Sequence, residues 1–212
     1  MYRSIQFTKL DYRVMKTQNK TLALFVVLAL ILSVTSTPGF AGIYMLFVMM
    51  ILATTPFSMD YYYQNGFVAL LPAKVRNRVS GRYLFGISYL LIGLILGETI
   101  TAASSIVSNE KLSAFFLIYP VVLFFIAAIF LAMQYTLLYA LGKEKQSYMK
   151  FITMVPGFII FFAGSAVGEK IEKINMTGEM IYGVIVGTVV LGIAVFFVFQ
   201  ELSVKIMSKK SA

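Results

Sequence analysis

One apolar stretch decides the class of fold: residues 113–141 read SAFFLIYPVVLFFIAAIFLAMQYTLLYAL. None of these residues is charged, and the stretch exceeds the roughly 20 apolar residues that a helix needs to cross a bilayer. A helix satisfies its own backbone hydrogen bonds, for which hydrocarbon offers no partners. The stretch therefore predicts a membrane-spanning helix, long enough to tilt or to project beyond the bilayer.

Five further windows pass the same test of length and apolarity: residues 21–37, 41–57, 83–107, 151–167 and 181–199. Pro38 and Gly39 favour a turn between the first two. The sequence thus predicts an all-α polytopic membrane protein, with six transmembrane helices in a single transmembrane domain over residues 1–212. An even number of crossings puts both termini on the same side of the membrane.

The composition excludes an ordinary soluble domain and several classes of site. Hydrophobic residues make up 59% and charged residues 13% of the chain, against about 45–50% and about 25% in typical soluble domains. The sequence contains no His and no Cys. These absences exclude His/Cys metal sites, Ser-His or Cys-His catalysis, and disulfides.

The net charge of +9 is concentrated in alternate connections. The N-terminal arm, the segments 58–82 and 142–150, and the C-terminal tail carry 15 of the 18 Lys and Arg residues. Because positive residues gather on the cytoplasmic side of membrane proteins, both termini are predicted to be cytoplasmic. The charge therefore indicates membrane orientation and lipid head groups, and it needs no nucleic acid as a partner.

The N-terminal arm, residues 1–18, is predicted to be an amphipathic helix that lies in the membrane interface. At helical spacing its apolar and basic residues separate onto two faces: Phe7, Leu10 and Val14 against Lys9, Arg13 and Lys16. The helix is either a surface anchor or an elbow helix that also braces a cytoplasmic partner. A cleavable signal peptide fits poorly, because the basic region is long and contains Asp11.

The segment 58–82 is the largest predicted connection and has an unusual composition. It contains Asp60, the run Tyr61-Tyr62-Tyr63, an apolar stretch from Phe67 to Pro72, and then basic residues. Apolar side chains that face cytoplasmic water need a cover. Either they pack against lipid head groups, or they form a docking helix for a soluble subunit.

The order of residues from Asp60 to Phe85 resembles the cytoplasmic loop of ABC-2-type permeases. The matching features are Asp60, Leu71-Pro72, the basic residues Lys74, Arg76 and Arg78, then Val79 and Gly81-Arg82-Tyr83-Leu84-Phe85. Helix number and loop sizes are similar to the compact six-helix bacterial branch, or type V exporters, which includes exporters of amphipathic peptides and peptide antibiotics. The sequence departs from the commoner pattern at Val75, where an Arg often follows the Leu-Pro pair.

The resemblance implies a coupling helix that sits in a groove of an ATPase subunit. The residues it assigns to this contact are Asp60, Tyr61, Tyr62, Tyr63, Phe67, Leu70, Leu71, Pro72, Lys74 and Arg76. It also implies two copies of a separate ABC ATPase, a second copy of this chain or a related permease, and the bacterial plasma membrane.

No phosphate-binding G-x-x-x-x-G-K-[ST] loop occurs in the sequence. Without this loop the chain alone lacks the means to hold and hydrolyse ATP. It is therefore predicted to be a non-catalytic subunit that binds no cofactor, with ATP and Mg²⁺ on the partner subunit.

Glu98 is the only acidic or basic residue well inside a predicted span. It lies about 22 Å along the helix from Tyr83, in the outer half of the bilayer, with Thr101 and Ser105 on the same face. A carboxylate at this depth is a functional candidate, because burying its charge is costly. We expect Glu98, Thr101 and Ser105 to line a substrate path; alternatively, Glu98 reaches an outer vestibule or pairs with Lys111.

Small and polar residues inside the spans predict contacts between helices. Three glycine pairs have the four-residue spacing of close helix packing: Gly93/Gly97, Gly164/Gly168 and Gly183/Gly187. They are expected to be contacts within the chain first and dimer contacts second. Gln134 is expected to make an interhelical hydrogen bond and is also placed on the substrate path. Pro156-Gly157 predicts a kink in the fifth span.

Three functions from different classes follow from these patterns. The resemblance favours the permease subunit of an ATP-driven exporter of amphipathic peptides or other hydrophobic compounds, with antimicrobial resistance as one outcome. The alternative is an ATP-independent membrane channel or an immunity protein. An intramembrane enzyme fits least, because Glu98 has no second carboxylate or base within the spans.

Overall fold

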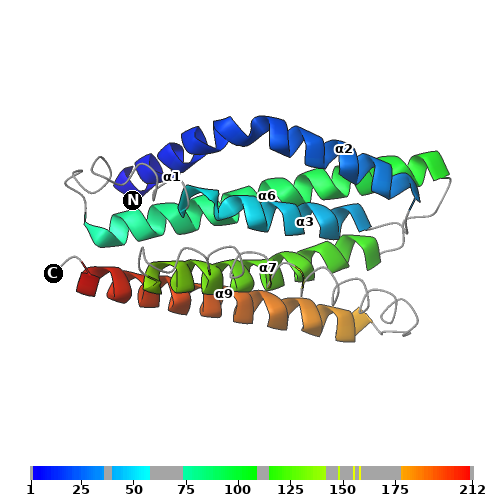
Figure 1. The fold of residues 1–212 in the computed structure, drawn as a ribbon. Helices are drawn as coiled ribbons and strands as arrows, with labels where there is room; N and C mark the ends of the chain where they lie inside the picture. The colour runs from blue at the N-terminus through cyan, green and yellow to red at the C-terminus, as the bar shows by residue number, and fades with distance from the viewer. Residues whose placement is uncertain are drawn as a thin grey trace.

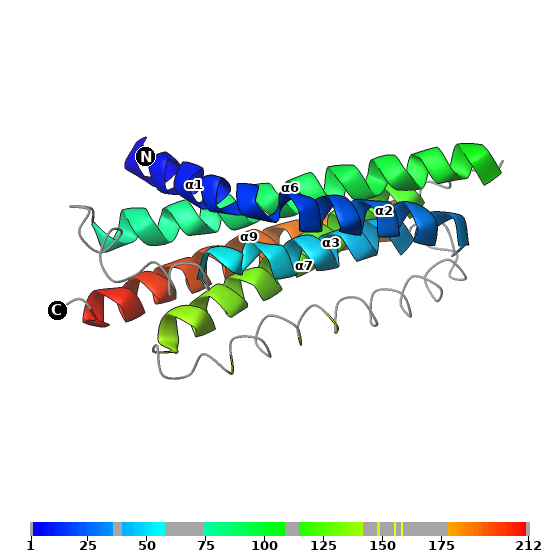
Figure 2. The ribbon, with the colours of Figure 1, turned by 45° about the horizontal axis from the view of Figure 1, so that its top comes forward.

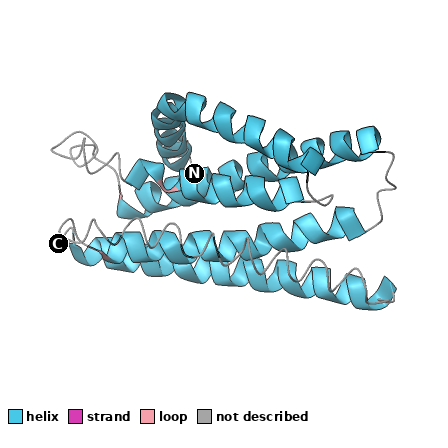
Figure 3. Ribbon diagram, turned by 45° about the vertical axis from the view of Figure 1, so that its right-hand side comes forward, coloured by secondary structure: helices cyan, strands magenta, loops and turns pink. Residues whose placement is uncertain are grey.

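The computed structural model describes residues 2–35, 40–57, 74–108, 115–141 and 178–210, together with positions 148, 155 and 158. Within these residues the regular structure is helical: α1 (Tyr2–Met15), the 3₁₀ turn η1 (Lys16–Gln18), α2 (Asn19–Thr35), α3 (Phe40–Ala53), α6 (Val75–Ser108), α7 (Phe115–Ala140) and α9 (Gly178–Lys210). The long helices α2, α3, α6, α7 and α9 run along a common direction, whereas α1, beside the N label, is inclined to them (Figure 3).

Five helical segments in the described residues are long and apolar enough to cross a membrane: Ser4–Ser33, Phe40–Phe57, Val75–Val107, Pro120–Ala140 and Tyr182–Lys210. They correspond to the first, second, third, fourth and sixth predicted spans. The fifth predicted span, 151–167, lies outside the described residues apart from Val155 and Phe158, so the number six stays a prediction. Its predicted kink at Pro156-Gly157 lies outside them too.

The bundle has α3 and α6 at its centre (Figures 1 and 2). The α1–α2 pair covers one side of α6, and α7 and α9 lie on the other side (Figure 1). Both termini lie at the end of the bundle where α3 ends and α6 begins. This end is called the loop end below, because residues 58–73 connect the two helices there.

The helices α7 and α9 run parallel to each other, side by side. Thr136 Oγ1 of α7 contacts Ser203 Oγ of α9 at 3.0 Å, and Lys210 Nζ donates to the carbonyl oxygens of Tyr139 and Ala140. The second contact lies about one turn further along α7 and about two turns further along α9, in the same direction along both helices. The end of α7, at Ala140, and the start of α9, at Gly178, therefore lie at opposite ends of the bundle (Figure 1).

The centre of the bundle is apolar and densely filled. Most of α3 is buried, and Met45, Met49 and Met50 have no exposed surface. The outer helices α2 and α9 instead expose many large apolar side chains, among them Leu24 and Phe197. A continuous apolar outer surface is unfavourable in water and fits hydrocarbon.

The glycine pair Gly93/Gly97 lies at the contact between α3 and α6, as predicted for packing within the chain. A Cβ built on Gly97 would lie 2.7 Å from the Gly42 Cα atom, and one on Gly93 would lie 2.5 Å from Met49 Cγ. Only glycine permits this approach of the two backbones. For Gly183 and Gly187 of α9, no heavy atom of the described part of the chain lies within 4 Å of such a Cβ. Gly164 and Gly168 lie outside the described residues.

Candidate functional site

Most of the predicted ATPase contact cannot be placed. Eight of its ten residues lie in the segment 58–73, outside the described residues: Asp60, Tyr61, Tyr62, Tyr63, Phe67, Leu70, Leu71 and Pro72. The described residues that border this segment are Phe57 and Lys74. Their surroundings at the loop end are therefore the part of the candidate site that the structure defines.

Lys74 and Arg76 lie at the start of α6. Lys74 is exposed, and its carbonyl oxygen accepts the Asn77 N–H at 2.9 Å, which opens the helix. The Arg76 guanidinium forms an ion pair with the Glu201 carboxylate of α9. An exposed pair of this kind adds little stability. The pair does bring residues 200–210 of α9 close to Arg76. These residues lie beyond the predicted span, and Arg76 lies just after the segment 58–73.

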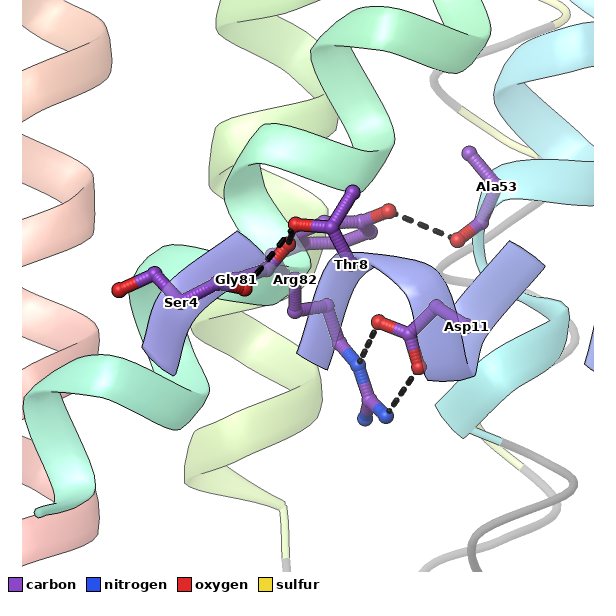
Figure 4. Close-up of polar contacts among 7 residues, drawn as sticks. Ser4, Thr8, Asp11, Ala53, Gly81 and Arg82 are labelled. Atoms are coloured by element: carbon purple, nitrogen blue, oxygen red, sulfur yellow. Dashed lines mark hydrogen bonds and ion pairs between the residues drawn. The ribbon is translucent and has the colours of Figure 1, made fainter. Parts of the chain in front are cut away.

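Arg82 and Asp11 form a buried ion pair between α6 and α1 (Figure 4). Arg82 Nη2 donates to Asp11 Oδ1 at 3.0 Å, and Arg82 Nε donates to Asp11 Oδ2 at 3.3 Å. The two side chains are only 11% and 8% exposed. A two-point pair satisfies both desolvated charges and fixes the orientation of the guanidinium plane.

The same guanidinium covers the aromatic ring of Phe57, the last described residue before the segment 58–73. Its central carbon lies 4.4 Å from the ring centroid, within the range of a cation–π contact. Phe57 in turn contacts the rings of Tyr135 and Tyr139 of α7, at centroid distances of 4.9 and 5.0 Å. Arg82 therefore connects Phe57, at one end of this segment, to α6, the helix that begins at the other end.

The side of α1 that packs on α6 carries Thr8 and Tyr12. Phe7 of the predicted apolar face also meets α6, because its Cβ lies 2.6 Å from the position that a Cβ on Gly81 would take. Thr8 Oγ1 donates to the Gly81 carbonyl oxygen at 2.8 Å, and Tyr12 Oη donates to Ser88 Oγ at 2.8 Å. A Cβ built on Gly81 would lie 2.6 Å from the Ser4 carbonyl oxygen, so glycine is needed for this close approach. The exposed Lys9, Arg13 and Lys16 point away from α6.

Tyr83, the next residue of α6, makes its contacts with α7 and α9. Its hydroxyl lies 3.0 Å from Thr136 Oγ1 and 2.8 Å from Ser203 Oγ, and these two hydroxyl oxygens are 3.0 Å apart. The carbonyl oxygens of Ala132 and Phe199 lie within 3.2 Å of the Tyr83 hydroxyl. Three buried hydroxyls thus form a closed triangle that connects three helices.

The predicted path residues of α6 lie in the other half of the bundle. Glu98 is half-buried, and its Oε1 atom lies 2.9 Å from the position that a Cβ on Gly42 would take. Thr101 and Ser105 are buried, and their hydroxyls donate to the carbonyl oxygens of Gly97 and Ala102 in the same helix. The contact with Glu98 Oε1 makes Gly42 of α3 a neighbour of Glu98. The spacing of residues in the sequence did not indicate this neighbour.

Gln134 does not join this group. It is fully buried in α7, two residues from Thr136, which contacts Tyr83. Glu98 lies 15 residues beyond Tyr83 in α6, which is about 22 Å along the helix. The four predicted path residues therefore occupy two separate levels of the bundle.

Sequence reasoning named Arg82 and Tyr83 only as part of the family motif and Asp11 only as an argument against a signal peptide. It missed the other residues that connect the helices at the loop end: Phe57, Tyr135, Thr136, Glu201 and Ser203. One signal was available, because Asp11 is the only acidic residue among the first 20. A lone acidic residue in a basic arm points to a buried or paired carboxylate. Its partner, 71 positions away, has no signature in the sequence.

In a comparison with protein families, the family model described as "ABC-2 family transporter protein" matches residues 7–208 of the chain. In the comparisons with curated proteins and with solved structures, nothing matches the chain.

Proposed function

Since this chain belongs to the ABC-2 transporter family, we propose that it is the permease subunit of an ATP-driven exporter. The match to the family over residues 7–208 is the observation that carries the proposal. Members of this family are in general non-catalytic, multi-pass membrane components that associate with an ABC ATPase. In the proposed complex two separate ATPase subunits bind ATP and Mg²⁺ and act on the loop end of two permease chains.

The loop end is the proposed ATPase face, on the cytoplasmic side. Exposed basic residues of three helices gather there, including Arg13 of α1, Lys74 of α6 and Lys209 of α9. Their gathering at one end fits the rule that positive residues stay in the cytoplasm. The coupling helix predicted for Tyr61 to Leu71 would then face the ATPase from this end.

We place the export path between two copies of the chain rather than inside one. The centre of the described bundle is filled by the methionines of α3 and by the contact of Gly42 with Gly97. This packing leaves no room for a peptide-sized route through α3 and α6. A dimer, or a pair with a related permease, supplies the second wall.

The proposed substrate is an amphipathic peptide or another hydrophobic compound, exported across a bacterial plasma membrane. Glu98 lies far from the loop end and is half-buried, so it would act in the outer part of the path and favour cationic cargo. Thr101 and Ser105 would support the helix around it through their bonds to its backbone.

The experiment is co-expression of the chain with a candidate ATPase from a neighbouring reading frame, followed by purification through a tag on one of them. We expect a stable complex whose ATPase activity falls when Tyr62→Asp or Leu70→Asp places a charge at the docking face. Tyr62→Phe is the matched control and keeps the activity. A chain that binds no ATPase and moves solutes without nucleotide would contradict the proposal and favour the ATP-independent channel.

A further inference from the structure

The helical stretch from α1 through η1 into α2 has an exposed row of side chains that changes from basic to apolar. Four exposed basic residues, called the basic row below, form its first half: Lys9, Arg13, Lys16 and Lys20. Three exposed apolar residues of α2 continue it: Leu24, Val27 and Ile31. Each member is three or four residues from the next, and positions at this spacing lie on one side of a helix. The same side of the helical stretch is therefore charged in its first half and apolar in its second.

The helical path continues through η1, so the two halves of the row stay aligned. Met15 and Asn19, which flank this turn, both have right-handed helical dihedral angles. The side of α1 that packs on α6 is a different one, since Lys9, Arg13 and Lys16 point away from α6.

Contacts with α6 place α1 at the level where the third predicted span begins. Thr8 Oγ1 donates to the Gly81 carbonyl oxygen, and Tyr12 Oη donates to Ser88 Oγ. The predicted span starts at Tyr83, between these two positions of α6. A helix that lies across this level lies in the layer of lipid head groups. The basic row therefore starts at the membrane surface.

The part of the chain that the structure describes has four carboxylates, and none of them compensates the basic row. They are Asp11, Glu98, Glu179 and Glu201. Asp11 pairs with Arg82 on the side of α1 that packs on α6 (Figure 4), and Glu201 pairs with Arg76. Glu98 lies in the other half of the bundle, and Glu179 lies in the first turn of α9, at the opposite end from Lys210. The negative charge that balances the row has to come from a binding partner or from solution.

We propose that the basic row binds the head groups of anionic phospholipids in the leaflet at the loop end. Positive side chains at a membrane surface attract anionic lipids, and each Lys or Arg adds to the attraction. Long basic side chains also extend along apolar surface, so Lys20 reaches the phosphates from the edge of the hydrocarbon. Leu24, Val27 and Ile31 then contact acyl chains. The inference goes beyond the proposed function and does not require an ATPase.

The apolar continuation of the row favours lipid over an acidic surface of a soluble protein, which would meet only the charged half. Other exposed lysines at the loop end lie farther from the membrane. Lys74 is about 14 Å before the third predicted span, and Lys205 and Lys209 are about 9 and 15 Å beyond the sixth. The head-group layer on each side of a bilayer is only about 5–8 Å thick. These three lysines therefore serve as matched controls.

A single Trp can report on the lipid beside the row, because the natural chain has none. Leu24→Trp places it next to the basic row, and Ile31→Trp places it on the same side of α2 but about 16 Å from Lys20. The full chain is reconstituted in vesicles. The measurement compares quenching of the Trp fluorescence by brominated phosphatidylglycerol, which is anionic, with quenching by brominated phosphatidylcholine, which is zwitterionic.

With Leu24→Trp, phosphatidylglycerol is expected to associate about fivefold more strongly than phosphatidylcholine, the factor that one nearby Lys contributes. With Ile31→Trp the two lipids are expected to quench equally. Raising the salt from 0.1 to 1 M shortens the Debye length from about 10 to about 3 Å and is expected to reduce the preference. The salt series tests the proposal without any change in the row.

Two triple variants, both made with Leu24→Trp, test which lysines cause the preference. The row variant changes Lys9, Lys16 and Lys20 to Gln and is expected to lose it; the same three changes to Arg are expected to keep it. The control variant changes Lys74, Lys205 and Lys209 to Gln and is expected to keep it, although it removes the same charge.

Equal quenching by the two lipids with Leu24→Trp overturns the proposal. A preference that survives in the row variant, or that falls equally in the row and control variants, overturns it as well. If the preference is absent and the row variant no longer copurifies with the ATPase, the row is a protein contact, and its assignment to lipid is wrong.

Discussion

At the scale of single residues, the Arg82–Asp11 pair has the greatest energetic consequence. Both side chains are almost fully withdrawn from solvent, and each satisfies the other at two points. The attraction between two buried charges is about as large as the cost of removing them from water. The pair therefore determines where α1 docks and adds little net stability. Loss of one partner is different, because it leaves an uncompensated charge.

Arg82→Gln is expected to lower the free energy of unfolding by about 3–5 kcal/mol, because the Asp11 carboxylate stays buried without its partner. The double variant with Asp11→Asn is expected to recover most of this loss. Reversible unfolding in detergent micelles measures both values. With Asp11→Asn measured alone as well, a loss in the double variant equal to the sum of the two single losses would show that the two side chains do not interact.

At the scale of helices, the contact between α3 and α6 depends on glycine. The Cβ that Gly97 lacks would lie 2.7 Å from a backbone atom of α3, which cannot move aside as a side chain end would. Gly187 of α9 has the same spacing to its own partner glycine but open surroundings. The two positions therefore give a matched pair of substitutions.

Gly97→Ala is expected to destabilise the bundle by about 1–3 kcal/mol through overpacking. Gly187→Ala is expected to be neutral or to stabilise by up to about 1 kcal/mol, because alanine favours helix. Unfolding midpoints of both variants in the same detergent give the comparison. If Gly187→Ala lowered the stability as much as Gly97→Ala does, Gly187 would have a close neighbour, and the explanation from its open surroundings would be wrong.

The helices that the sequence predicted best are those defined by apolar length alone. The structure has α2, α3 and α7 within two residues of the predicted starts, at Asn19, Phe40 and Phe115. Two helices are longer than their apolar windows, because the apolar sequence ends at the first charged residues whereas the helix continues past them. These are α6, which begins at Val75, and α9, which continues to Lys210.

The contacts between helices could not be predicted from the sequence, for a different reason. Arg82 and Asp11 are 71 positions apart, and Tyr83 and Ser203 are 120 apart. Nothing in local spacing pairs such residues, since a helix face shows where contacts form but not with which helix. Glycine pairs share this limit: Gly93/Gly97 lies at a helix contact and Gly183/Gly187 does not, although their spacing is the same.

At the scale of the whole molecule, the loop end gathers both termini, the start of α6 and the exposed basic residues. Single cysteines can test on which side of the membrane it lies. Lys16→Cys and Lys209→Cys are expected to react with a membrane-impermeant maleimide only after cells are permeabilised. Val107→Cys, which is 77% exposed at the other end, is expected to react in intact cells.

Labelling of Lys209→Cys in intact cells would reverse the proposed orientation and remove the loop end as an ATPase face. The pattern of charge makes this outcome unfavourable, because many positive residues would have to cross the membrane. Mass spectrometry of the labelled chain provides the readout, and a lysate sample confirms that each cysteine is reactive.

The parallel course of α7 and α9 has a consequence for biogenesis. A hairpin can assemble as soon as its second half leaves the ribosome, but α9 can meet α7 only after residues 142–177 have been synthesised. Until then the hydroxyls of Tyr83 and Thr136 lack Ser203, so the contact that connects α6, α7 and α9 is completed by the last described helix to be made.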